Sequence, residues 1–569
     1  MTDISPPTTS LQRALVLGDD TRSFLAVVRG LGREGIEVHA APADFTSPAL
    51  TSRYIRQIHR LPDWSGDGGA WLQAIEAILQ ATKFDVVIPC NETTLLPLYR
   101  HRERLSRLAG LAIPGDEALR VLFDKSATRD LAAQLGIPVS RGRMLRRQDV
   151  AEDLLAEFGT PIVVKPVQSY KIGSLHRREK VRVITTVEEL QKLLAVVEPT
   201  ETLVEAFFPG DGIGVSIFAD RGAVRQVFEH HRVREDDGAS YYRVSASIDP
   251  AMAEATAKLA GAVGFSGIAM FEFKRQPAGN WILLEVNARP WGSMPLPLAL
   301  GINFPYLWFQ QIVGGQSASN KTYKVGVYGR NLMPDLKAIH TEFKRRQGGS
   351  GKTGYVLNRL FDFRRILLGT EVQDVCVADD LRPAFSELQK FSFEAFSRMG
   401  QQFTAYRWLC RIRAHKLIKR QLSGGGRILF VCRGNICRSP FAERLLTNLK
   451  LAGVTARSAG TMPFTGRPAP ELAQQQAVLQ GVDLASHRSK TLDPADIESS
   501  DLIVIFDNIN WNDIVSKYPH VKHKILKIGY LISLNEIDDP VDGNASVFNE
   551  VYCRIVTSVT ILANCVRRI

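Results

Sequence analysis

The chain has 569 residues, which is enough for three or four folded units of ordinary size. Apolar residues make up 45% and charged residues 23%, a composition that excludes a wholly disordered protein. Lys and Arg outnumber Asp and Glu by 71 to 59, and the net charge of +12 favours anionic partners such as nucleotides, phosphates or acidic surfaces.

The sequence lacks the patterns of a secreted or membrane-spanning protein. Its seven cysteines have no regular spacing, and the polar residues 1–10 do not resemble a signal peptide. The most apolar stretch, residues 294–313, is interrupted by prolines and polar residues. We therefore expect a cytoplasmic protein whose thiols stay reduced and available for chemistry.

Short apolar runs alternate with helical patterns at the start of the chain. Residues 13–18, 36–41 and 85–89 are typical of buried strands, and a helical pattern follows the first of them. This alternation predicts a parallel α/β domain over residues 1–120.

Residues 121–315 have longer strands in pairs, with helices such as 251–263 between them, which predicts an α+β domain. Lys125 opens a helix and Lys165 lies within a strand. Glu272 lies on the strand before that of Glu285, and the strand period of two puts Asn287 on the face of Glu285.

Two carboxylates and an amide oxygen form a hard-oxygen Mg²⁺ site that leaves room for phosphate ligands. The two lysines would supply positive charge to a polyphosphate. The pattern therefore predicts an ATP–Mg²⁺ site built without a Walker loop.

Residues 348–353 look like such a loop, but a charged helical segment precedes them where a strand is required, and we reject that interpretation.

These residues resemble the ATP-grasp superfamily, in the branch shared with carbamoyl-phosphate synthetase and biotin carboxylase. The most specific part is Glu285-x-Asn287-x-Arg289. Such enzymes join a small carboxylate to an amine through an acyl phosphate. The resemblance implies that Lys125 and Lys165 contact phosphates and adenine, and that Glu205 with the backbone of Ala206 and Phe208 forms the adenine hinge. It also implies that Glu272, Glu285 and Asn287 hold Mg²⁺ (or Mn²⁺). Arg289 would face the transferred phosphoryl group.

Two further features admit alternatives. The basic residues His230, His231, Arg232 and Arg243 could bind a substrate carboxylate, but we favour a solvated edge strand. Residues 398–420 hold seven Lys or Arg and no acid, with apolar residues among them. They could lie on an anionic membrane surface, but we favour a linker helix packed on a catalytic domain. They belong to a basic, partly helical extension over residues 316–426, which ends in a glycine-rich break.

A strand beginning at Arg427 runs into Cys432, and five residues separate that cysteine from Arg438. Such a loop can turn its backbone N–H groups onto one anion. Pro440 suits the first position of the helix that follows, and the helix N-terminus and Arg438 favour the thiolate form of Cys432. Asp539 is a plausible proton donor to the leaving group, with Asp538 beside it to favour the protonated acid.

Residues 427–569 resemble the low-molecular-weight protein tyrosine phosphatases, which have a doubly wound parallel sheet. The resemblance implies Cys432 as nucleophile, Arg438 as phosphate binder, Asp539 as general acid, Ser439 as donor to the thiolate, and Asn435 and His487 as braces of the loop. Ile436 stands where arginine phosphatases of the family tend to have threonine, which favours phosphotyrosine. Val541 and Asp542 follow the Asp-Pro pair where the family often has aromatic residues, which questions a preference for aromatic esters.

The sequence thus predicts a multidomain α/β protein with domains at 1–120, 121–315, 316–426 and 427–569. We expect a bifunctional enzyme whose partners are ATP, a small carboxylate, an amine and a phosphotyrosine protein, with no nucleic acid. One alternative is a regulatory phosphatase whose ATP-grasp part only binds nucleotide or a partner. Another is a phosphatase domain that serves for docking alone, against which Asp539 argues.

Overall fold

The structure is a computed structural model, and its chain divides into two compact units, Met1–Glu387 and Leu388–Ile569. The rejected Walker-like run, residues 348–353, lies outside the described residues. Within the described part of the chain, no helix combines the length and apolar character needed to cross a membrane. The described residues are 11–175, 178–236, 238–315, 320–345, 354–355, 359, 361–400 and 404–568.

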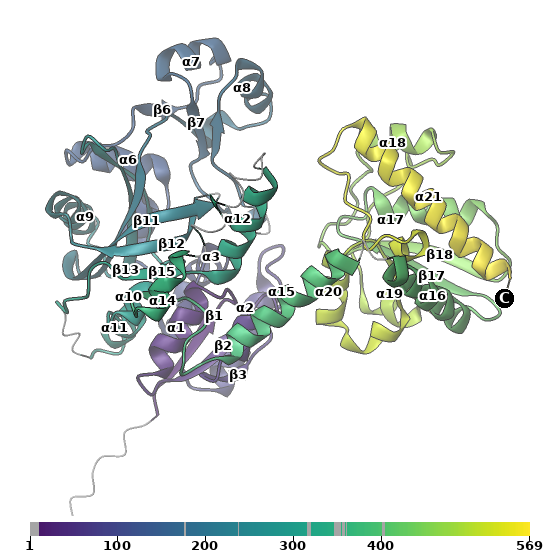
Figure 1. Ribbon diagram of the computed structural model, residues 1–569, viewed down its shortest axis with the longest axis horizontal. Helices are drawn as coiled ribbons and strands as arrows, with labels where there is room; N and C mark the ends of the chain where they lie inside the picture. Colours follow the sequence, from purple (N-terminus) through teal and green to yellow (C-terminus); the bar gives the residue numbers. More distant parts are fainter. Residues whose placement is uncertain are drawn as a thin grey trace, which may run out of the picture. The chain divides into compact units, whose positions relative to one another are not determined.

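The first unit begins with a five-stranded parallel sheet in the order β3-β2-β1-β4-β5 (Figure 1). Apolar side chains pack on both of its faces, as the alternation of strands and helices predicts. The strand order reverses between β1 and β4, and open α/β sheets bind ligands beyond the carboxyl ends of strands at such a point. The strands are β1 (Arg13–Leu17), β2 (Glu37–Ala41), β3 (Ile55–Ile58), β4 (Val86–Pro89) and β5 (Gly110–Leu111).

Helices connect these strands and lead to the next sheet. The first, α1 (Ser23–Gly32), packs its apolar face on β1 and β2. Asn91 caps the N-terminus of α3 by accepting a hydrogen bond from the backbone N–H of Thr94 at 3.0 Å. The other helices here are α2 (Gly69–Ala81), α3 (Glu92–Arg100), α4 (Arg102–Leu105), α5 (Asp116–Leu122) and α6 (Lys125–Gln134).

A four-stranded antiparallel sheet, in the order β6-β9-β7-β8, forms a small lobe with its own apolar core. Leu154, Phe158 and Leu190 bury their side chains in that core from the two helices that cover the sheet (Figure 1). The elements are β6 (Gly142–Met144), α7 (Ala151–Phe158), β7 (Ile162–Pro166), β8 (Arg182–Ile184), α8 (Val187–Leu194) and β9 (Thr202–Ala206).

The largest sheet has seven strands in the order β14-β13-β10-β11-β12-β15-β16. All neighbours pair antiparallel except β15 and β16, which are parallel. One of its faces packs on α9 (Pro250–Ala262) and α6. The strands are β10 (Asp211–Asp220), β11 (Ala223–Asp236), β12 (Ala239–Ala246), β13 (Gly267–Arg275), β14 (Trp281–Asn287), β15 (Tyr328–Arg330) and β16 (Glu371–Gln373).

Strands β15 and β16 come from the segment 316–426, which the sequence analysis sets apart as an extension. Here the described residues 320–387 belong to the first unit and complete its large sheet. The helices that accompany them are α10 (Pro295–Ala299), α11 (Phe304–Ile312), α12 (Leu332–Arg345), α14 (Arg364–Leu367) and α15 (Arg382–Gly400), of which α15 runs across the boundary between the units.

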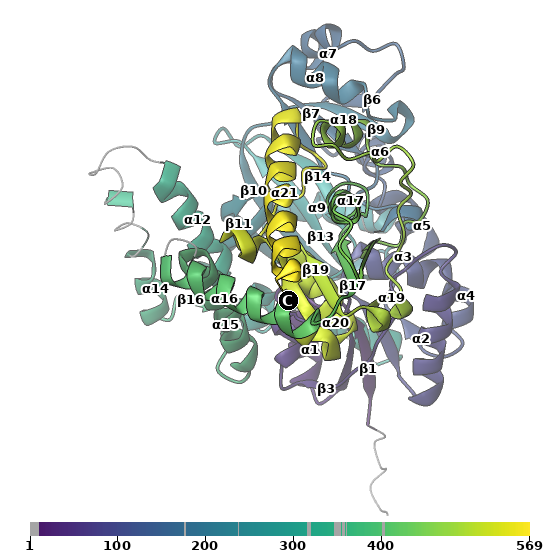
Figure 2. The same ribbon diagram turned by 90° about the vertical axis from the view of Figure 1, so that its right-hand side faces the viewer.

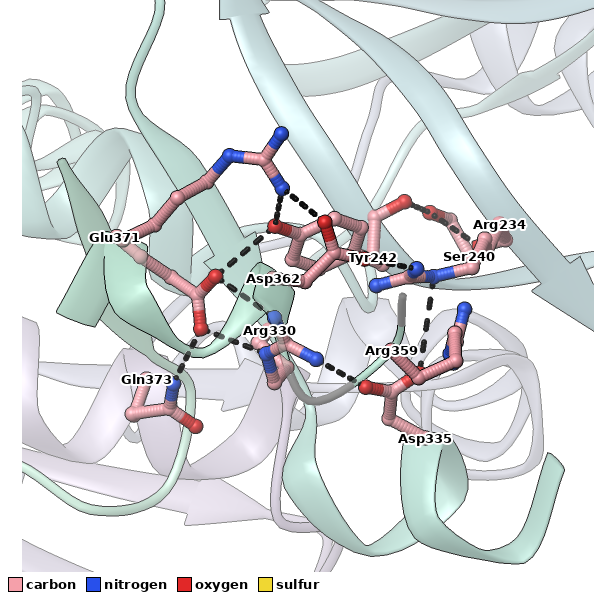
Figure 3. Close-up of polar contacts among 10 residues, drawn as sticks. Arg234, Ser240, Tyr242, Arg330, Asp335, Arg359, Asp362, Glu371 and Gln373 are labelled. Carbon is pink, nitrogen blue, oxygen red and sulfur yellow. Dashed lines mark hydrogen bonds and ion pairs between the residues drawn. The ribbon is translucent and has the colours of Figure 1, made fainter. Parts of the chain in front are cut away.

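Buried arginines and acids tie this segment to the sheet (Figure 3). The Arg330 guanidinium donates to both carboxylate oxygens of Glu371, at 2.6 and 2.8 Å, and also to Asp335. Arg359 donates to the other oxygen of Asp335. The Tyr242 hydroxyl donates to Glu371 at 2.9 Å, and Arg330 lies over the Tyr242 ring. Arg330 and Asp335 have no exposed side-chain surface, so each charge depends on its partners.

Replacing Asp335 with alanine should therefore destabilise the first unit. The change removes the carboxylate that pairs with the buried Arg359 and one of the two carboxylates that pair with the buried Arg330. Breaking a buried pair in this way costs about 3–5 kcal/mol. Chemical denaturation of the full chain would measure the loss as a lower midpoint of the first unit. The exposed pair of Glu117 with Arg120 is the control, because Glu117→Ala should change that midpoint little. Equal midpoints for the two variants would contradict the prediction.

The second unit is a four-stranded parallel sheet in the order β18-β17-β19-β20, with helices on both faces. The long helix α21 packs along α17 and α18 (Figures 1 and 2). This is the doubly wound sheet that the sequence predicts. The elements are β17 (Gly426–Cys432), α17 (Arg438–Asn448), β18 (Val454–Gly460), α18 (Glu471–Val478), α19 (Pro494–Ser499), β19 (Leu502–Ile505), α20 (Asn508–Lys517), β20 (Ile525–Lys527) and α21 (Ala545–Arg567).

The basic helix α16 (Thr404–Gln421) belongs to this unit. Ala414 and Ile418 are buried in the core of the second unit, as is Leu422 directly after the helix. Its other described faces carry the basic residues, with Trp408 and Leu409 exposed. Through its buried residues the helix packs against the second unit, which is the interpretation that the sequence analysis favours.

Two candidate active sites

The first candidate site is the loop between β17 and α17. Cys432 ends the strand, and its Sγ accepts a hydrogen bond from the backbone N–H of Asn435 at 3.2 Å. The Oγ of Ser439 lies 3.1 Å from the same sulfur. Cys432 is only 2% exposed, so its side chain is enclosed by the loop and the elements around it. The backbone N–H of Asn435 and the hydroxyl of Ser439 thus both lie within hydrogen-bonding distance of the one sulfur.

Asn435 holds the loop in its curled form. Its φ of +51° is left-handed, a conformation that asparagine tolerates better than most residues. Its side-chain amide donates to the Oγ atoms of Ser439 and Ser458 at 2.9 and 2.8 Å. Because Ser439 accepts from Asn435, its own hydroxyl proton is free to point at Cys432. His487 Nε2 lies 2.7 Å from the Asn435 carbonyl and donates to it, and burial lowers the pKa of His487, which favours the neutral ring.

Arg438 begins α17, and its guanidinium is 1% exposed. It donates to Asp507 at 2.6 Å, to the carbonyl of Ile537 at 2.9 Å and to Asp539 at 2.6 Å. Burial alone would lower the pKa of Arg438, but the charges of Asp539, Cys432 and Asp507 outweigh it and raise the pKa. Because Arg438 is the first residue of α17, Pro440 is the third helical residue and not the first, which the sequence analysis expects. A proline is tolerated there because the N–H groups of the first turn have no partner within the helix.

The second candidate site is a cleft in the first unit with an empty volume of about 710 Å³, including its open mouth. It combines basic, acidic and apolar side chains from residues 92–289. Of the residues expected to bind ATP or metal, Lys125, Glu285, Asn287 and Arg289 line it. Its other lining residues are Glu92, Leu96, Leu122, Phe123, Thr128, Gln168, Ser169, Tyr170, Arg178, Val286 and Ala288.

The oxygen atoms expected to hold a metal lie on β13 and β14. Glu272 is directly opposite Glu285 in the register of these strands, so the two side chains share a face. The amide of Asn287 donates to Glu272 at 3.0 Å. Burial raises the pKa of Glu272, and the nearby Glu285 raises it further. Carboxylate and amide oxygens suit Mg²⁺, although the described residues contain no cluster of three or more His, Cys, Asp or Glu side chains arranged for a metal.

Arg232 contributes a charge that the sequence analysis placed elsewhere. Its guanidinium lies 2.5 Å from Glu272, reaching across β10 at Gly212. A side chain at Gly212 would come within 2.7 Å of Arg232, so glycine is needed for this crossing. His230 crosses Gly214 in the same way, and a Cβ there would lie 2.2 Å from its ring.

The edge-strand interpretation of these basic residues is wrong. β11 lies between β10 and β12, and β12 is an interior strand because β15 and β16 continue the sheet beyond it. His230 is 1% exposed, and Arg243 is fully buried with Asp374 at 2.6 and 3.0 Å. His231 points to the opposite face and is 40% exposed. None of the four lines the cleft described above.

The residues expected near adenine form a separate group. Lys165 on β7 and Glu205 on β9 make a buried ion pair at 2.6 Å. Ala206 ends β9, and Phe208 follows in the connection to β10. The Nζ of Lys125 donates to Ser169 Oγ at 2.9 Å, burial lowers the pKa of Lys125, and the charge of Lys165 lowers that pKa further. The structure thus brings Lys125 to the cleft lining and leaves Lys165 with Glu205.

Glu92 is the residue of this site that sequence reasoning missed. It lies in the first turn of α3, directly after β4, and its carboxylate accepts from Arg289 at 2.7 Å. Burial would raise the pKa of Glu92, but Arg289 outweighs it and lowers the pKa. Tyr170 and Arg178 also line the cleft. The signal that could have found Glu92 is its place after a strand at the point where the strand order reverses.

Comparison with known proteins identifies the second unit. Residues 427–569 match the family model of the low molecular weight phosphotyrosine protein phosphatase. The low-molecular-weight protein-tyrosine-phosphatase Etp of Escherichia coli (strain K12) is 35% identical over 125 residues, which cover 22% of this chain and 84% of the relative. The protein-arginine-phosphatase of Geobacillus stearothermophilus is 33% identical over 139 residues, covering 24% and 93%. The chain belongs to the low-molecular-weight phosphotyrosine protein phosphatase family.

The first unit contains an ATP-grasp domain. Residues 198–330 match the family model described as ATP-grasp in the biosynthetic pathway with Ter operon. Among solved structures, an L-amino acid ligase from Bacillus licheniformis is 18% identical with a TM-score of 0.42, covering 56% of this chain and 78% of that one. The chain therefore joins an ATP-grasp domain to a phosphatase domain.

Proposed function

We propose that the second unit hydrolyses phosphotyrosine in proteins through a phosphocysteine intermediate. The observation that carries this proposal is the convergence of the Cys432 sulfur, the Arg438 guanidinium and the Asp539 carboxylate at one loop. The Cys432 thiolate attacks phosphorus, the bond from phosphorus to the phenolic oxygen breaks, and Asp539 gives its proton to that oxygen. Water then attacks the phosphocysteine, Asp539 takes the proton, and the thiolate leaves towards Ser439.

Arg438 would hold two phosphoryl oxygens in a bidentate fork. Its guanidinium contacts Asp539 and the carbonyl of Ile537, which lie on one loop, and Asp507, which precedes α20. Protonation of Asp539 removes the charge that Arg438 contacts, and the incoming phosphate supplies a replacement. In this way one contact couples substrate binding to the acid form of Asp539.

The substrate preference can be tested at Ile436. We expect phosphotyrosyl peptides to exceed phosphoarginyl peptides in kcat/KM by about 10-fold or more, and Ile436→Thr to narrow that ratio, because a difference of this size needs about 1–3 kcal/mol of pocket contacts. Steady-state phosphate release on matched peptides measures both values. Ile532→Thr, half-buried beneath α21, is the control. A wild-type preference for phosphoarginine would overturn the proposed substrate class.

We propose that the first unit joins a carboxylate to an amine, with ATP cleaved to ADP through an acyl phosphate. Support comes from the cleft, where Lys125, Glu285, Asn287 and Arg289 meet. Glu272, Glu285 and Asn287 would hold Mg²⁺, which supplies charge neutralisation of the phosphates when bound. Lys165 with Glu205, and the backbone of Ala206 and Phe208, would bind adenine. Arg289 would steady the carboxylate that accepts the phosphoryl group.

The test is the release of ADP and phosphate by Cys432→Ser protein given Mg-ATP and pools of carboxylates and amines. Release that depends on the pool supports ligation, and dividing the pool leads to the substrates. ATP binding without release for any pool would favour the alternative, a phosphatase regulated by a nucleotide-binding domain. The cysteine substitution matters because it removes phosphate release by the second unit.

A further inference from the structure

We infer that the carboxylate substrate of the ATP-grasp domain is an α-amino acid, whose ammonium group contacts Glu92 while its carboxylate contacts Arg289. This inference rests on the proposed ligation and names the substrate class for that site. The two residues are 197 positions apart in the chain, yet they form an ion pair at 2.7 Å in the wall of the cleft.

The ion pair discriminates between classes of substrate by charge. Arg289 alone would attract any carboxylate, but Glu92 beside it repels the same group at nearly the same distance. A simple carboxylate therefore gains little. An α-amino acid carries its ammonium and carboxylate on neighbouring carbons, so it can lie alongside the pair with each charge next to the opposite one. The protein pair need not separate, and no charge is left unpaired in the cleft.

Arg289 has bonding capacity for such a ligand. Its guanidinium donates to Glu92, to Asn287 at 3.2 Å and to the carbonyl of Pro290 at 2.7 Å. Its Nε has no hydrogen-bond partner among the described residues although it is buried. A buried donor without a partner costs free energy that a substrate oxygen would recover.

The position of Glu92 also favours a ligand there. It follows β4 at the carboxyl edge of the first sheet, at the reversal of strand order between β1 and β4. Leu96 lies one helical turn further along α3 and lines the same cleft. An apolar side chain on the amino acid would contact Leu96, whereas an acidic one would face Glu92. We therefore expect amino acids with apolar side chains to bind best.

The experiment measures binding to the full chain carrying Cys432→Ser, with Mg²⁺ and a non-hydrolysable ATP analogue present. The probes are the protein amino acids, and for leucine and phenylalanine also the analogues that lack one charge. These are 4-methylpentanoate and 3-phenylpropanoate without the ammonium group, and 3-methylbutylamine and 2-phenylethylamine without the carboxylate. We expect an amino acid to bind about 10-fold or more tightly than either of its analogues, since each analogue forfeits a charged contact.

Glu92→Gln gives the sharper result, because it should move two affinities in opposite directions. Amino-acid binding should weaken about 10-fold, while binding of the analogue without the ammonium group should strengthen as the repulsion disappears. A variant that merely misfolds cannot strengthen any binding. Glu117→Gln, an exposed acid on α5 paired with Arg120, should leave both affinities unchanged.

Three outcomes would overturn the inference: no amino acid binds, the analogues bind as well as the amino acids, or Glu92→Gln weakens both classes alike. Binding of the ATP analogue alone is recorded first. If the nucleotide does not bind, the proposed ligase function itself fails. If it binds and the amino-acid result is negative, only the substrate class is wrong.

Discussion

Cys432→Ser is expected to lower the phosphatase kcat by about 10⁴-fold or more, since loss of a nucleophile that works together with an acid has effects of this order. A serine hydroxyl keeps the size and the contacts to Asn435 and Ser439, but it is protonated at neutral pH and attacks phosphorus poorly. Phosphate release from an aryl phosphate measures the loss. Binding of inorganic phosphate should persist, because Arg438 and the loop N–H groups are unchanged.

The matched control is the second cysteine of the same loop. Cys437 is 2% exposed, and burial raises the pKa of its thiol, which keeps it protonated. Cys437→Ser should therefore retain most of the activity, within about 10-fold, because the thiol does not serve as a nucleophile. Full turnover by Cys432→Ser, or equal losses in the two variants, would show that the phosphocysteine mechanism is wrong.

The double change Glu285→Ala with Asn287→Ala is expected to reduce ATP-dependent ADP release by about 10³-fold, because it removes oxygen atoms that would hold Mg²⁺ on the phosphates. Mg-ATP affinity should fall as well. ADP formation and nucleotide binding measure the two effects. The phosphatase activity of the same protein is an internal control, since the second unit has its own core.

Glu254→Ala provides a matched control in the first unit. Glu254 is an exposed carboxylate on α9 that pairs with Lys258 on the same helix. Its loss removes a charge without touching the cleft, so ADP release should be unchanged. Undiminished Mg-ATP binding in the double variant would contradict the proposed Mg²⁺ site. A loss in Glu254→Ala of the same size would mean that charge in this domain matters in general.

Much of the fold could be predicted because its signals are local. A buried strand is recognised by a run of apolar residues. The loop from Val431 through Cys432 to the helix is likewise recognised from the few residues that form it. The pair Glu285 and Asn287 follows from the period of a strand alone. The doubly wound sheet of the second unit and the parallel sheet of the first were expected for these reasons, and both are present.

The error at β11 and β12 shows where local signals end. His230 and Arg243 are polar, and polar residues on a strand ordinarily indicate a solvated edge. His230 lies on β11, between β10 and β12, while β12 is an interior strand only because β15 and β16 continue the sheet beyond it. Those two strands come from about 80–135 residues further along the chain than β12. Arg243 can be buried because Asp374 supplies its counter-charge at that distance in sequence. The residues near β12 in the sequence therefore cannot show that this strand is interior or that Arg243 has a counter-charge.

By itself, the sequence showed which candidate residues share local elements: a cysteine and an arginine on one loop, and two acids and an amide on paired strands with an arginine just beyond. Those elements form from contacts near in sequence, so their residue pattern is sufficient. The tertiary structure alone decided which charges meet across the fold. It places Glu92 on Arg289, Arg232 on Glu272, and Asp507 on Arg438. Such pairs depend on how whole sheets and helices pack, because an ion pair requires proximity in space and leaves no periodic trace in the chain.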